Sequence, residues 1–497
     1  MTELFFKALA IIYFMTAGTL VIYGLNCYIM IFLFKKGTKK AEAFRKSIYE
    51  QSGDLSEYTA KHQGLPSITT QLPIYNEYNV AERVIKAACN MKYPKDLHEV
   101  QVLDDSTDET SELIAKVAAD LCAIGHDIKI IRRKNRTGFK AGALAEGLKQ
   151  AKGELIAIFD ADFVPPEDYL LKTVPFFLEN SDLGLVQARW GHLNRRVSLL
   201  TRAQSIGIDG HFMVEQSARN WSGLYMNFNG TAGIWRKPAI YDGGGWQWDT
   251  LTEDMDLSYR VQFAGWKTLY LPDLVVPAEI PEDISAFKSQ QFRWAKGSIQ
   301  TAIKLLPQIF TTPSSLFKKI EAFFHLTHYM VHPMMAILAV LALPVLLTLD
   351  AAPGAVLFVL LAVLLCFAMA APSTMYIVSQ QAAYYNWKRK IVFLPFLVAV
   401  GTGLAVSNTR AVFEAVCGIK SGFIRTPKKG NRGIKNYRVK MPWTAVLEII
   451  LGFHCVVSLF FYLSFGKYLV GPFLAIYAAG FLFTGFLTVV QSFIKNG

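Results

Sequence analysis

Hydrophobic residues are distributed along this chain in two different ways. A nearly uninterrupted apolar stretch runs from Phe5 to Phe34. Further long apolar stretches occupy 322–349, 355–378, 443–465 and 468–493. Each is longer than the roughly 20 residues that a helix needs to cross a bilayer. Between Leu65 and Pro281, short apolar runs alternate with amphipathic stretches instead. The pattern predicts transmembrane helices that flank a large polar domain in the sequence.

The polar region is predicted to form an α/β fold. Runs such as SITTQLP and HEVQVLDD alternate with helical stretches such as AERVIKAACNM and TSELIAKVAADLCAIG. Strands that alternate with helices indicate a mainly parallel sheet. Polar groups end three of the predicted strands, at Tyr75–Glu77, Asp104–Asp105 and Asp160–Asp162. Because ligands of open α/β sheets bind at the carboxyl ends of strands, we expect these groups to converge.

Basic residues predict how the chain is oriented. Lysines and arginines follow the first apolar stretch at once, between residues 35 and 46. The positive-inside rule places this end in the cytosol and the N-terminus outside. The short turn at 350–354 carries no basic residue, so it is expected outside. The polar domain is therefore expected in the cytosol.

The segment 391–416 is ambiguous. It is apolar, but it contains Pro395, Gly401 and the polar run at 407–410. If it crossed the membrane once, the following segment 420–440, with eight Lys/Arg and no acid, would lie outside. That location violates the positive-inside rule. We therefore expect an interfacial or re-entrant helix and five crossings, with six crossings as the alternative.

A second amphipathic helix is predicted at 292–310, lying in the membrane interface. Its apolar positions recur at helical spacing, and its lysines fall on the polar side: Ile299, Ile303, Leu306 and Ile309 against Lys296 and Lys304.

These features divide the chain into four parts. They are a transmembrane helix with a basic linker (1–46), a catalytic domain (47–290), an interfacial helix (291–321) and a transmembrane region (322–497) that includes the 391–416 helix and a cytosolic loop at 418–440.

Composition supports a membrane protein. The 497 residues are 52% hydrophobic, and the mean hydropathy is +0.27. The formal net charge is +12, but the basic residues cluster beside apolar segments. Membrane topology therefore explains the charge better than nucleic-acid binding does. The six cysteines form no C-x-x-C pair, so we expect reduced thiols without a zinc site or a disulfide framework.

Asp160 and Asp162 are the first candidates for chemistry. They follow a predicted buried strand, which would present two carboxylates at the edge of the sheet. Mg²⁺ and Mn²⁺ favour such oxygen ligands and often bind substrate phosphates at the same time. A lone D-x-D is also compatible with a polar turn. The other motifs favour a metal and donor site.

Asp104, Asp105 and Lys140 are candidate contacts to a nucleotide. Carboxylates at a strand end can accept hydrogen bonds from a base or a ribose, although an Asx-turn or a helix cap would also use them. We expect one of the two aspartates to bind and its neighbour to cap. Lys140 lies among small residues in GFKAGA, where a phosphate could approach. A surface lysine is the alternative.

Asp254, in TEDMD, is the candidate general base. A carboxylate within hydrogen-bond reach can take the proton of an acceptor hydroxyl as the new bond forms. Thr252 or Glu253 could orient it, and a helix N-cap is the alternative role. In QQFRW, Arg293 can neutralise a leaving diphosphate, and Trp294 offers a flat face to a sugar ring. An aromatic belt with a snorkelling arginine is the alternative for this motif.

A basic, glycine-containing loop carries one more candidate, the run from Phe423 to Lys428. It could fold over a nucleotide diphosphate and close the site. A solvated positive-inside loop is the alternative.

Taken together, the motifs resemble a known family. QVLDDSTDET, GFKAGAL, FDADF, GLVQARW, FNGTAG-W, TEDMDL and QQFRW are similar to the processive family-2 glycosyltransferases. That group includes cellulose synthase and the plant cellulose synthase-like proteins. The motif sequences are most similar to those of the mannan, glucomannan and xyloglucan-backbone synthase branches. The resemblance implies a GT-A-like nucleotide-diphospho-sugar transferase domain fused to an α-helical transmembrane bundle.

The resemblance also implies roles for individual residues. Donor contacts would come from Tyr75, Glu77, Asp105, Lys140, Gln290, Arg293, Thr426 and Lys428. Asp160 would meet the nucleotide and Asp162 the metal, Asp254 would be the base, and Trp294 with Glu253 would meet the acceptor. The loop matches a gating motif at Phe423, Thr426 and Lys428, but Arg425 replaces the usual valine. We expect no cyclic-dinucleotide regulatory domain within this chain.

The leading hypothesis is an inverting β-glycan synthase in the membrane. Its expected partners are a nucleotide-sugar donor, the growing glycan and the bilayer, and no nucleic acid is expected. The sequence does not indicate the oligomeric state. UDP-glucose is the favoured donor and GDP-mannose the next. The bundle would pass the product outward. The alternatives are a non-processive transferase acting on ceramide or a polyprenyl phosphate, and an inactive scaffold or transporter.

Overall fold

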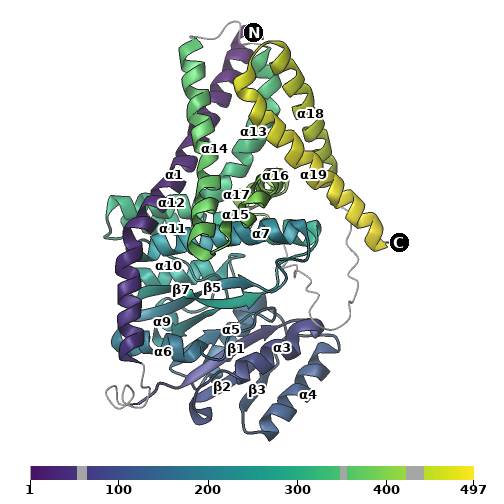
Figure 1. Cartoon of the computed structure of the whole chain (residues 1–497). Coiled ribbons are helices and arrows are strands. Elements are labelled where there is room, and N and C mark those ends of the chain that lie inside the picture. The colour runs from purple at the N-terminus through teal and green to yellow at the C-terminus, as the bar shows by residue number, and fades with distance from the viewer. Residues whose placement is uncertain (1, 53–63, 348–354, 421–441, 497) are drawn as a thin grey trace.

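The computed structural model describes residues 2–52, 64–347, 355–420 and 442–496. Its elements form three layers (Figure 1). A bundle of long helices carries the N-terminus at its far end, and an α/β domain forms the opposite end of the molecule. A layer of shorter helices lies between them. The predicted combination of a GT-A-like domain with a helical bundle is confirmed.

The α/β domain is built on a seven-stranded sheet with the order β3-β2-β1-β4-β6-β5-β7. The strands are β1 Ile68–Ile74, β2 His98–Asp104, β3 Asp127–Ile131, β4 Leu155–Ile158, β5 Leu183–His192, β6 Gly233–Arg236 and β7 Lys267–Ala278. Strands β3, β2, β1 and β4 run parallel, β6 is antiparallel to both of its neighbours, and β7 is parallel to β5. All seven residues of β2 are buried, because helices cover both faces. The predicted parallel-rich sheet is confirmed.

Helices pack on the two faces of this sheet. They are α3 Tyr78–Cys89, α4 Thr110–Ala123, α5 Phe139–Gln150, α6 Tyr169–Glu179, α8 Ser217–Trp221, α9 Lys237–Asp242 and α10 Glu253–Phe263. Helix α7, Leu199–Asp209, lies in the middle layer, between the sheet and the bundle. A 3-10 turn, η1 Lys95–Leu97, and a π-helical segment, η2 Gly210–Gln216, complete the set. Val84 of α3 and Phe176 of α6 belong to the core on one face. Leu144 of α5 and Leu257 of α10 belong to the core on the other. The strands end between these two cores.

The remaining helices form the bundle and the middle layer. They are α1 Thr2–Gln51, α11 Ile284–Thr311, α12 Leu316–Thr327, α13 Val331–Leu346, α14 Ala355–Ala383, α15 Trp387–Lys390, α16 Leu394–Gly403, α17 Ala405–Val416, α18 Thr444–Ser464 and α19 Gly471–Asn496. Short 3-10 turns join some of them: η3 His328–Met330, η5 Ile391–Phe393 and η6 Tyr468–Val470.

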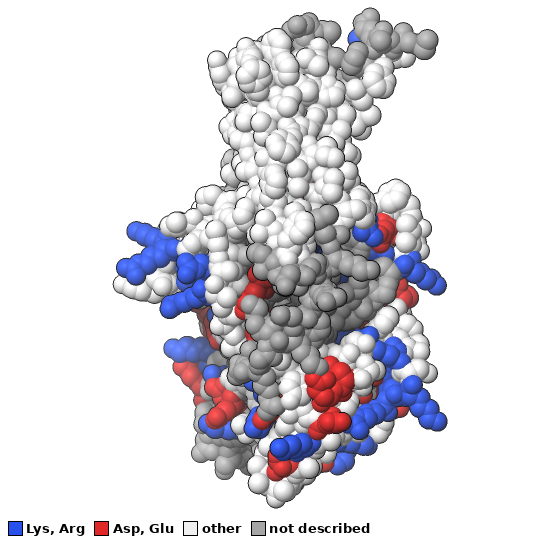
Figure 2. Space-filling model, turned by 90° about the vertical axis from the view of Figure 1, so that its right-hand side faces the viewer, with Lys and Arg blue, Asp and Glu red and all other residues white. Residues whose placement is uncertain are grey.

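Within the described residues, five helices are long and apolar enough to cross a membrane. The bent pair α16–α17 would make six if it formed one span. The axes of its two halves differ by 42°, as expected for a broken span or a re-entrant segment. In the face shown in Figure 2, charged side chains gather over the lower part of the molecule and the upper bundle is almost free of them. Five or six crossings both remain predictions.

Two expected boundaries are wrong. The basic residues after the first apolar stretch do not form a linker, because α1 continues as one helix to Gln51. Its C-terminal end is held by Arg45, which pairs with Asp273 at 2.7 Å and lies over the ring of Trp221. The interfacial helix starts at Ile284, not at 291, because the Asp283 side chain accepts a hydrogen bond from the backbone N–H of Ala286 and caps the helix there.

The faces of α11 also differ from the expected amphipathic pattern. Ile299 and Ile309 are buried against other helices, so they are not available to lipid. Lys296, expected on the polar side, is completely buried in an ion pair. Ile303 is the position of this predicted stripe that stays largely exposed. Helix packing against the α/β domain and the bundle therefore accounts for most of the apolar periodicity.

Candidate active site

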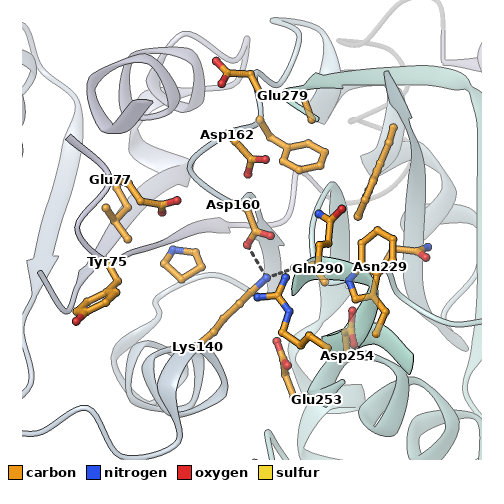
Figure 3. A pocket seen from close by; sticks show the side chains of 18 of the residues that line it. Tyr75, Glu77, Lys140, Asp160, Asp162, Asn229, Glu253, Asp254, Glu279 and Gln290 are labelled. Atoms are coloured by element: carbon orange, nitrogen blue, oxygen red, sulfur yellow. Dashed lines mark hydrogen bonds and ion pairs between the residues drawn. The ribbon is translucent and has the colours of Figure 1, made fainter. Parts of the chain in front are cut away.

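The polar groups expected to converge do lie at one edge of the sheet. Strands β1, β2 and β4 are parallel neighbours, so their carboxyl ends meet there. The segments after these strands line a single cavity with parts of α10 and α11 (Figure 3). The functional side chains around it are Tyr75, Glu77, Asp105, Arg136, Lys140, Asp160, Asp162, Asn229, Glu253, Asp254, Gln290, Arg293 and Trp294. Residues up to about 220 positions apart in the chain thus share one site.

Lys140 lies in the first turn of α5 and reaches into this cavity (Figure 3). Its Nζ lies 2.5 Å from Oδ1 of Asp160 and donates a hydrogen bond to the carbonyl of Gly230 at 2.7 Å. Burial lowers the pKa of the Lys140 amine, but the charges of Asp160 and Glu253 more than offset this and the pKa lies above its ordinary value. The side chain is therefore a fixed cation, which is what a phosphate site needs.

The segment before β6 meets the end of β4 because these strands are antiparallel. Their register pairs the last residue of β4 with the first residue of β6. The hydroxyl of Thr231 accepts a hydrogen bond from the backbone N–H of Asp160 at 2.9 Å. Gly230 has a φ of +80°, and a Cβ at that position would lie 2.9 Å from Oδ2 of Asp254. Glycine thus lets the backbone pass between the acidic motif and the candidate base.

Asp254 lies in the first turn of α10. Its Oδ1 accepts a hydrogen bond from the backbone N–H of Met255 at 2.8 Å. Burial raises the pKa of Asp254 to about 7, and the neighbouring carboxylate of Glu253 adds to the rise. Burial also raises the pKa of Glu253, against the opposing charge of Lys140. A carboxylate with a pKa near neutrality is suited to accept a proton from a substrate hydroxyl.

Helix α11 brings three predicted residues to the cavity on one face. Gln290, Arg293 and Trp294 are spaced at i, i+3 and i+4, so they lie on the same side of the helix. Arg293 lies within electrostatic reach of four carboxylates, those of Glu253, Asp160, Asp254 and Asp162. It is a further cation of the site, beside Lys140 and Arg136 in the cavity lining.

The same helix supports the segment that carries the base. Gly297 packs so closely that a Cβ there would lie 2.6 Å from Cγ2 and 2.8 Å from the backbone N of Thr252. The hydroxyls of Thr252 and Thr301 are 3.0 Å apart and hydrogen-bonded. The side-chain carbonyl of Gln300 accepts a hydrogen bond from the backbone N–H of Leu251. Helix α11 therefore positions both the predicted diphosphate contacts and Asp254.

Two buried ion pairs fasten α11 to the bundle and the middle layer. Lys288 pairs with Glu448 of α18 at 2.6 Å, and it also contacts the hydroxyl of Thr488 on α19. Lys296 pairs with Glu414 of α17 at 2.8 Å. The two lysines flank Gln290, Arg293 and Trp294 in the sequence. The cavity-lining part of α11 is thus tied to the candidate spans α18 and α19 before it and to α17 after it.

The opposite side of the cavity has the groups predicted for the nucleotide. Tyr75 lies beneath the guanidinium group of Arg136, whose carbon is 3.3 Å from the ring centre. Asp105 forms a bidentate ion pair with Arg133, with 2.9 Å between Nε and Oδ1. Figure 3 shows Tyr75 and Glu77 on one side of the two motif aspartates and Gln290 on the other. The donor can therefore extend across Asp160 and Asp162.

Asp104 does not fit the donor contact predicted for it. It is not among the cavity-lining residues, and its carboxylate is fully buried. It accepts hydrogen bonds from the backbone N–H of Ser106, the hydroxyl of Ser111 and the Nε of Arg132. Asp104 is thus structural and Asp105 faces the cavity, because consecutive residues after a strand point in different directions.

Aromatic and histidine side chains line the end of the cavity near α11. The rings of Trp190 and Trp294 lie 6.4 Å apart at 54°. His192, two residues after Trp190, has its Nε2 3.0 Å from Oδ1 of Asp209. Trp190 and His192 end β5, while Asp209 ends α7 and also accepts a hydrogen bond from Gln380 of α14. This end of the cavity is suited to a sugar, since rings can stack on its C–H faces.

Asp160 and Asp162 are the residues predicted to hold a metal ion. Within the described residues no group of three or more His, Cys, Asp or Glu side chains forms a complete metal site. Asp160 and Asp162 do line the cavity together, and one or two carboxylates are the usual protein share of a Mg²⁺ site that substrate phosphates complete. The residues therefore fit a cation that binds with the donor.

Two predicted donor contacts cannot be placed. Thr426 and Lys428, with the rest of the predicted gating motif, lie outside the described residues, as does most of the expected 418–440 loop. Several cavity residues were not predicted at all, among them Arg136, Asn229, Gly230 and His192. Nor was Gly297, which packs against Thr252 and does not line the cavity. Asn229 and Gly230 belong to the FNGTAG motif, which contributed to the family resemblance but was assigned no residue role.

Comparisons with known proteins agree with this geometry. Residues 66–297 match a family described as "Glycosyltransferase like family 2". Probable glucomannan 4-beta-mannosyltransferase 10 of Arabidopsis thaliana is 32% identical over 491 residues, which cover 97% of this chain and 87% of that protein. Probable glucomannan 4-beta-mannosyltransferase 7 of Oryza sativa subsp. japonica is 44% identical over 278 residues, which cover 54% of this chain and about half (48%) of that protein.

Among solved structures, the mannosyltransferase PcManGT from Pyrobaculum calidifontis, in complex with GDP-Man and Mn²⁺, aligns with a TM-score of 0.46 and 17% identity. That alignment covers 76% of this chain and 100% of the other, and the likeness is too low to carry an argument. The sequence relatives are sufficient, because one of them aligns along nearly the whole chain. This protein therefore belongs to glycosyltransferase family 2 and is an enzyme related to the glucomannan 4-beta-mannosyltransferases.

Proposed function

We propose that the protein is an inverting, processive β-glycosyltransferase that lengthens a β-glycan at the membrane surface. One observation carries the proposal. Asp254 shares a cavity with the cations Lys140 and Arg293, and the helix that carries Arg293 is fastened to membrane helices by buried ion pairs. A base and two cations suit transfer from a sugar diphosphate, and the fastening suits an acceptor that lies along the bundle.

The proposed step uses these groups in fixed roles. Asp254 accepts the proton of the acceptor hydroxyl, and the hydroxyl oxygen forms a bond to the anomeric carbon. The bond from that carbon to the diphosphate breaks on the opposite face, which inverts the configuration. Lys140 and Arg293 stabilise the negative charge that develops on the leaving diphosphate. When bound at Asp160 and Asp162, Mg²⁺ or Mn²⁺ would add positive charge at the same diphosphate.

The relatives, rather than any single residue, support a choice of donor sugar. The sequence motifs put UDP-glucose first and GDP-mannose second. The relatives named above are glucomannan mannosyltransferases, and one of them aligns over 97% of this chain. We therefore place GDP-mannose first and keep UDP-glucose as the competing donor. Trp190 and Trp294, near the acceptor end, offer stacking faces that fit either hexose.

The proposal also covers topology. The α/β domain would lie in the cytosol, because the basic residues of α1 follow its apolar part on the side of that domain. The lengthening glycan would leave the acceptor end of the cavity and cross the membrane through the bundle. Glycan that becomes protected from added glycanase inside sealed proteoliposomes would support this route. Product that stays fully digestible outside the vesicles would contradict it.

The decisive experiment is transfer by the purified full-length protein from labelled GDP-mannose and labelled UDP-glucose. Products are sized and then digested with a β-mannanase or a β-glucanase. We expect a polymer that the β-mannanase degrades. A product with a single sugar on a lipid would instead support a non-processive transferase. Neither donor consumed, in protein that is folded, would reject the proposed reaction.

A matched pair of variants tests the base. Asp254→Asn should lower transfer about 10²- to 10⁴-fold while donor binding persists, since a general base contributes that much. Asp127→Asn makes the same change at the exposed first residue of β3, at the end of the strand away from the cavity and outside its lining, and should leave transfer unaltered. Equal activity in both variants would remove Asp254 from the mechanism.

A further inference from the structure

A cationic surface lies where the α/β domain meets the end of a candidate membrane span. It is formed by two segments, 193–202 after β5 and 384–394 after α14. Together they contain six basic residues and no acidic residue: Arg195, Arg196, Arg202, Lys388, Arg389 and Lys390. We call these two segments the cationic surface. Neither the base nor the diphosphate contacts belong to it.

Side-chain contacts hold the two segments against each other. Arg195 donates a hydrogen bond to Oε1 of Gln380 at 3.2 Å, and its guanidinium carbon lies 4.9 Å from the ring centre of Tyr384. Lys390 lies over the same ring. Arg202 lies over the ring of Phe393 at 5.1 Å. Cations from both segments are therefore brought together on shared aromatic rings.

The position of this surface along the molecule is set by α14. Residues 363–383 of that helix form a candidate membrane span, and Tyr384 follows directly. The charged turn α15 comes three residues later, so it must lie at the end of the span. Figure 1 shows α15 and α7 in the middle layer, between the bundle and the sheet. The cationic surface is thus at the level of lipid headgroups.

The described residues leave most of this charge uncompensated. Asp209 is the carboxylate nearest to Arg195, at 3.8 Å, and it is fully buried and already bonded to His192 and Gln380. Across the described residues, no carboxylate lies within 4.0 Å of Arg196, Arg202 or the three cations of α15. Like charges held this close favour binding of an anion.

Exposed apolar side chains lie between the cations. Val197 is 59% exposed, Val392 is 71% exposed, and Leu193, Leu199 and Tyr385 are also exposed. A water-soluble anion would leave these side chains in water. A lipid would satisfy both features, since its phosphate meets the cations and its acyl chains cover the apolar groups.

We propose that the cationic surface binds the headgroups of anionic phospholipids, with the phosphate held between the 193–202 segment and α15. The apolar side chains of the two segments enter the upper part of the acyl region. This binding site is separate from the donor cavity, so the proposal does not depend on the donor or on the reaction.

Native mass spectrometry of the full-length protein in neutral detergent tests this site. The protein is titrated with phosphatidylglycerol and, separately, with phosphatidylcholine of the same acyl chains. We expect tighter retention of phosphatidylglycerol. The triple variant K388Q/R389Q/K390Q should weaken it by about a hundredfold, since each basic residue at a membrane surface contributes roughly 1 kcal/mol. The charge-conserving variant K388R/K390R should retain binding, which separates loss of charge from loss of folding.

The matched control removes three cations elsewhere. K149Q/K152Q/K267Q changes exposed lysines of the α/β domain, each already paired with an acidic residue. It should leave phosphatidylglycerol binding unaltered. Equal losses in the two triple variants, or no preference for the anionic lipid in the wild-type protein, would overturn the proposal. If glycerol 3-phosphate displaces the lipid at a similar concentration, the surface binds a soluble phosphate and the lipid proposal is wrong.

Discussion

Lys296 of α11 and Glu414 of α17 form an ion pair with 2.8 Å between Nζ and Oε2, and the lysine side chain has no solvent exposure. Arg410 donates a further hydrogen bond to Oε1 of the same glutamate at 2.7 Å. Lys296 stands three residues after Arg293 and immediately before Gly297. The pair therefore fixes α11 at the point where the helix both lines the cavity and supports the segment of the base.

Breaking this ion pair is expected to destabilise the protein. Glu414→Leu leaves a buried ammonium group without its partner, which costs roughly 3–5 kcal/mol in comparable cases. Thermal unfolding in detergent should show the loss, and transfer per folded molecule should fall because Arg293 loses its fixed position. The exchanged pair K296E/E414K should recover part of both losses.

Lys149→Met is the control for that pair. Lys149 is largely exposed and its ion pair with Glu146 is at the surface, so a change well under 1 kcal/mol is expected. A lowered unfolding temperature with full transfer per folded molecule would show that the Lys296–Glu414 pair stabilises the fold without positioning the site.

Gly297→Ala should be destabilising, contrary to the usual effect of this substitution in a helix. Alanine normally stabilises a helix interior by roughly 0.5–1 kcal/mol relative to glycine. At Gly297, however, the new Cβ would lie 2.6 Å from Cγ2 of Thr252 and 2.8 Å from its backbone N. Gly401→Ala, on α16, has nothing within 4 Å and should show the usual sign. Unfolding temperatures and transfer rates of the two variants measure the difference.

Gly230→Ala should reduce activity more than stability. Its φ of +80° strains any side chain, and its Cβ would lie 2.9 Å from Oδ2 of Asp254. Gly223→Ala is matched, because its φ is +68° and it has nothing within 4 Å. Both variants should lose roughly 1–2 kcal/mol of stability from backbone strain. Only Gly230→Ala should lower kcat/KM at least tenfold. Equal kinetic effects would show that the contact with Asp254 is unimportant.

The pH profile of transfer should have an acidic limb near neutrality. A base must be ionised, and burial with the charge of Glu253 raises the pKa of Asp254 to about 7. The value of kcat/KM should therefore rise between about pH 6 and 8, since it reports the free enzyme. Glu253→Gln removes one cause of the raised pKa, so the limb should move to lower pH.

Asp249→Asn is the control for that shift. Asp249 is exposed, pairs with Lys304 and does not line the cavity, so the limb should stay in place. A limb that does not respond to Glu253→Gln would assign it to a group other than Asp254.

The sequence by itself determined the elements and most of the chemical groups. The periodicity of apolar residues predicted the parallel-rich sheet and the long helices, because burial of a repeating face is a local property of each segment. Asp160 and Asp162 could be singled out because they follow a predicted strand, whose carboxyl end is where ligands of open α/β sheets bind. The family motifs then pointed to glycosyl transfer.

Only the tertiary structure decided how these groups are used. Asp104 and Asp105 are indistinguishable in the sequence, and only the packing around the sheet edge buries one and leaves the other facing the cavity. Lys296 looked like a polar-face lysine, because its partner Glu414 lies 118 residues away and only chain folding brings it near. Gly230 and Gly297 matter because Asp254 and Thr252, respectively, lie too close for a side chain at these positions. Local patterns encode burial and propensity, whereas contacts between distant segments exist only once the chain is packed.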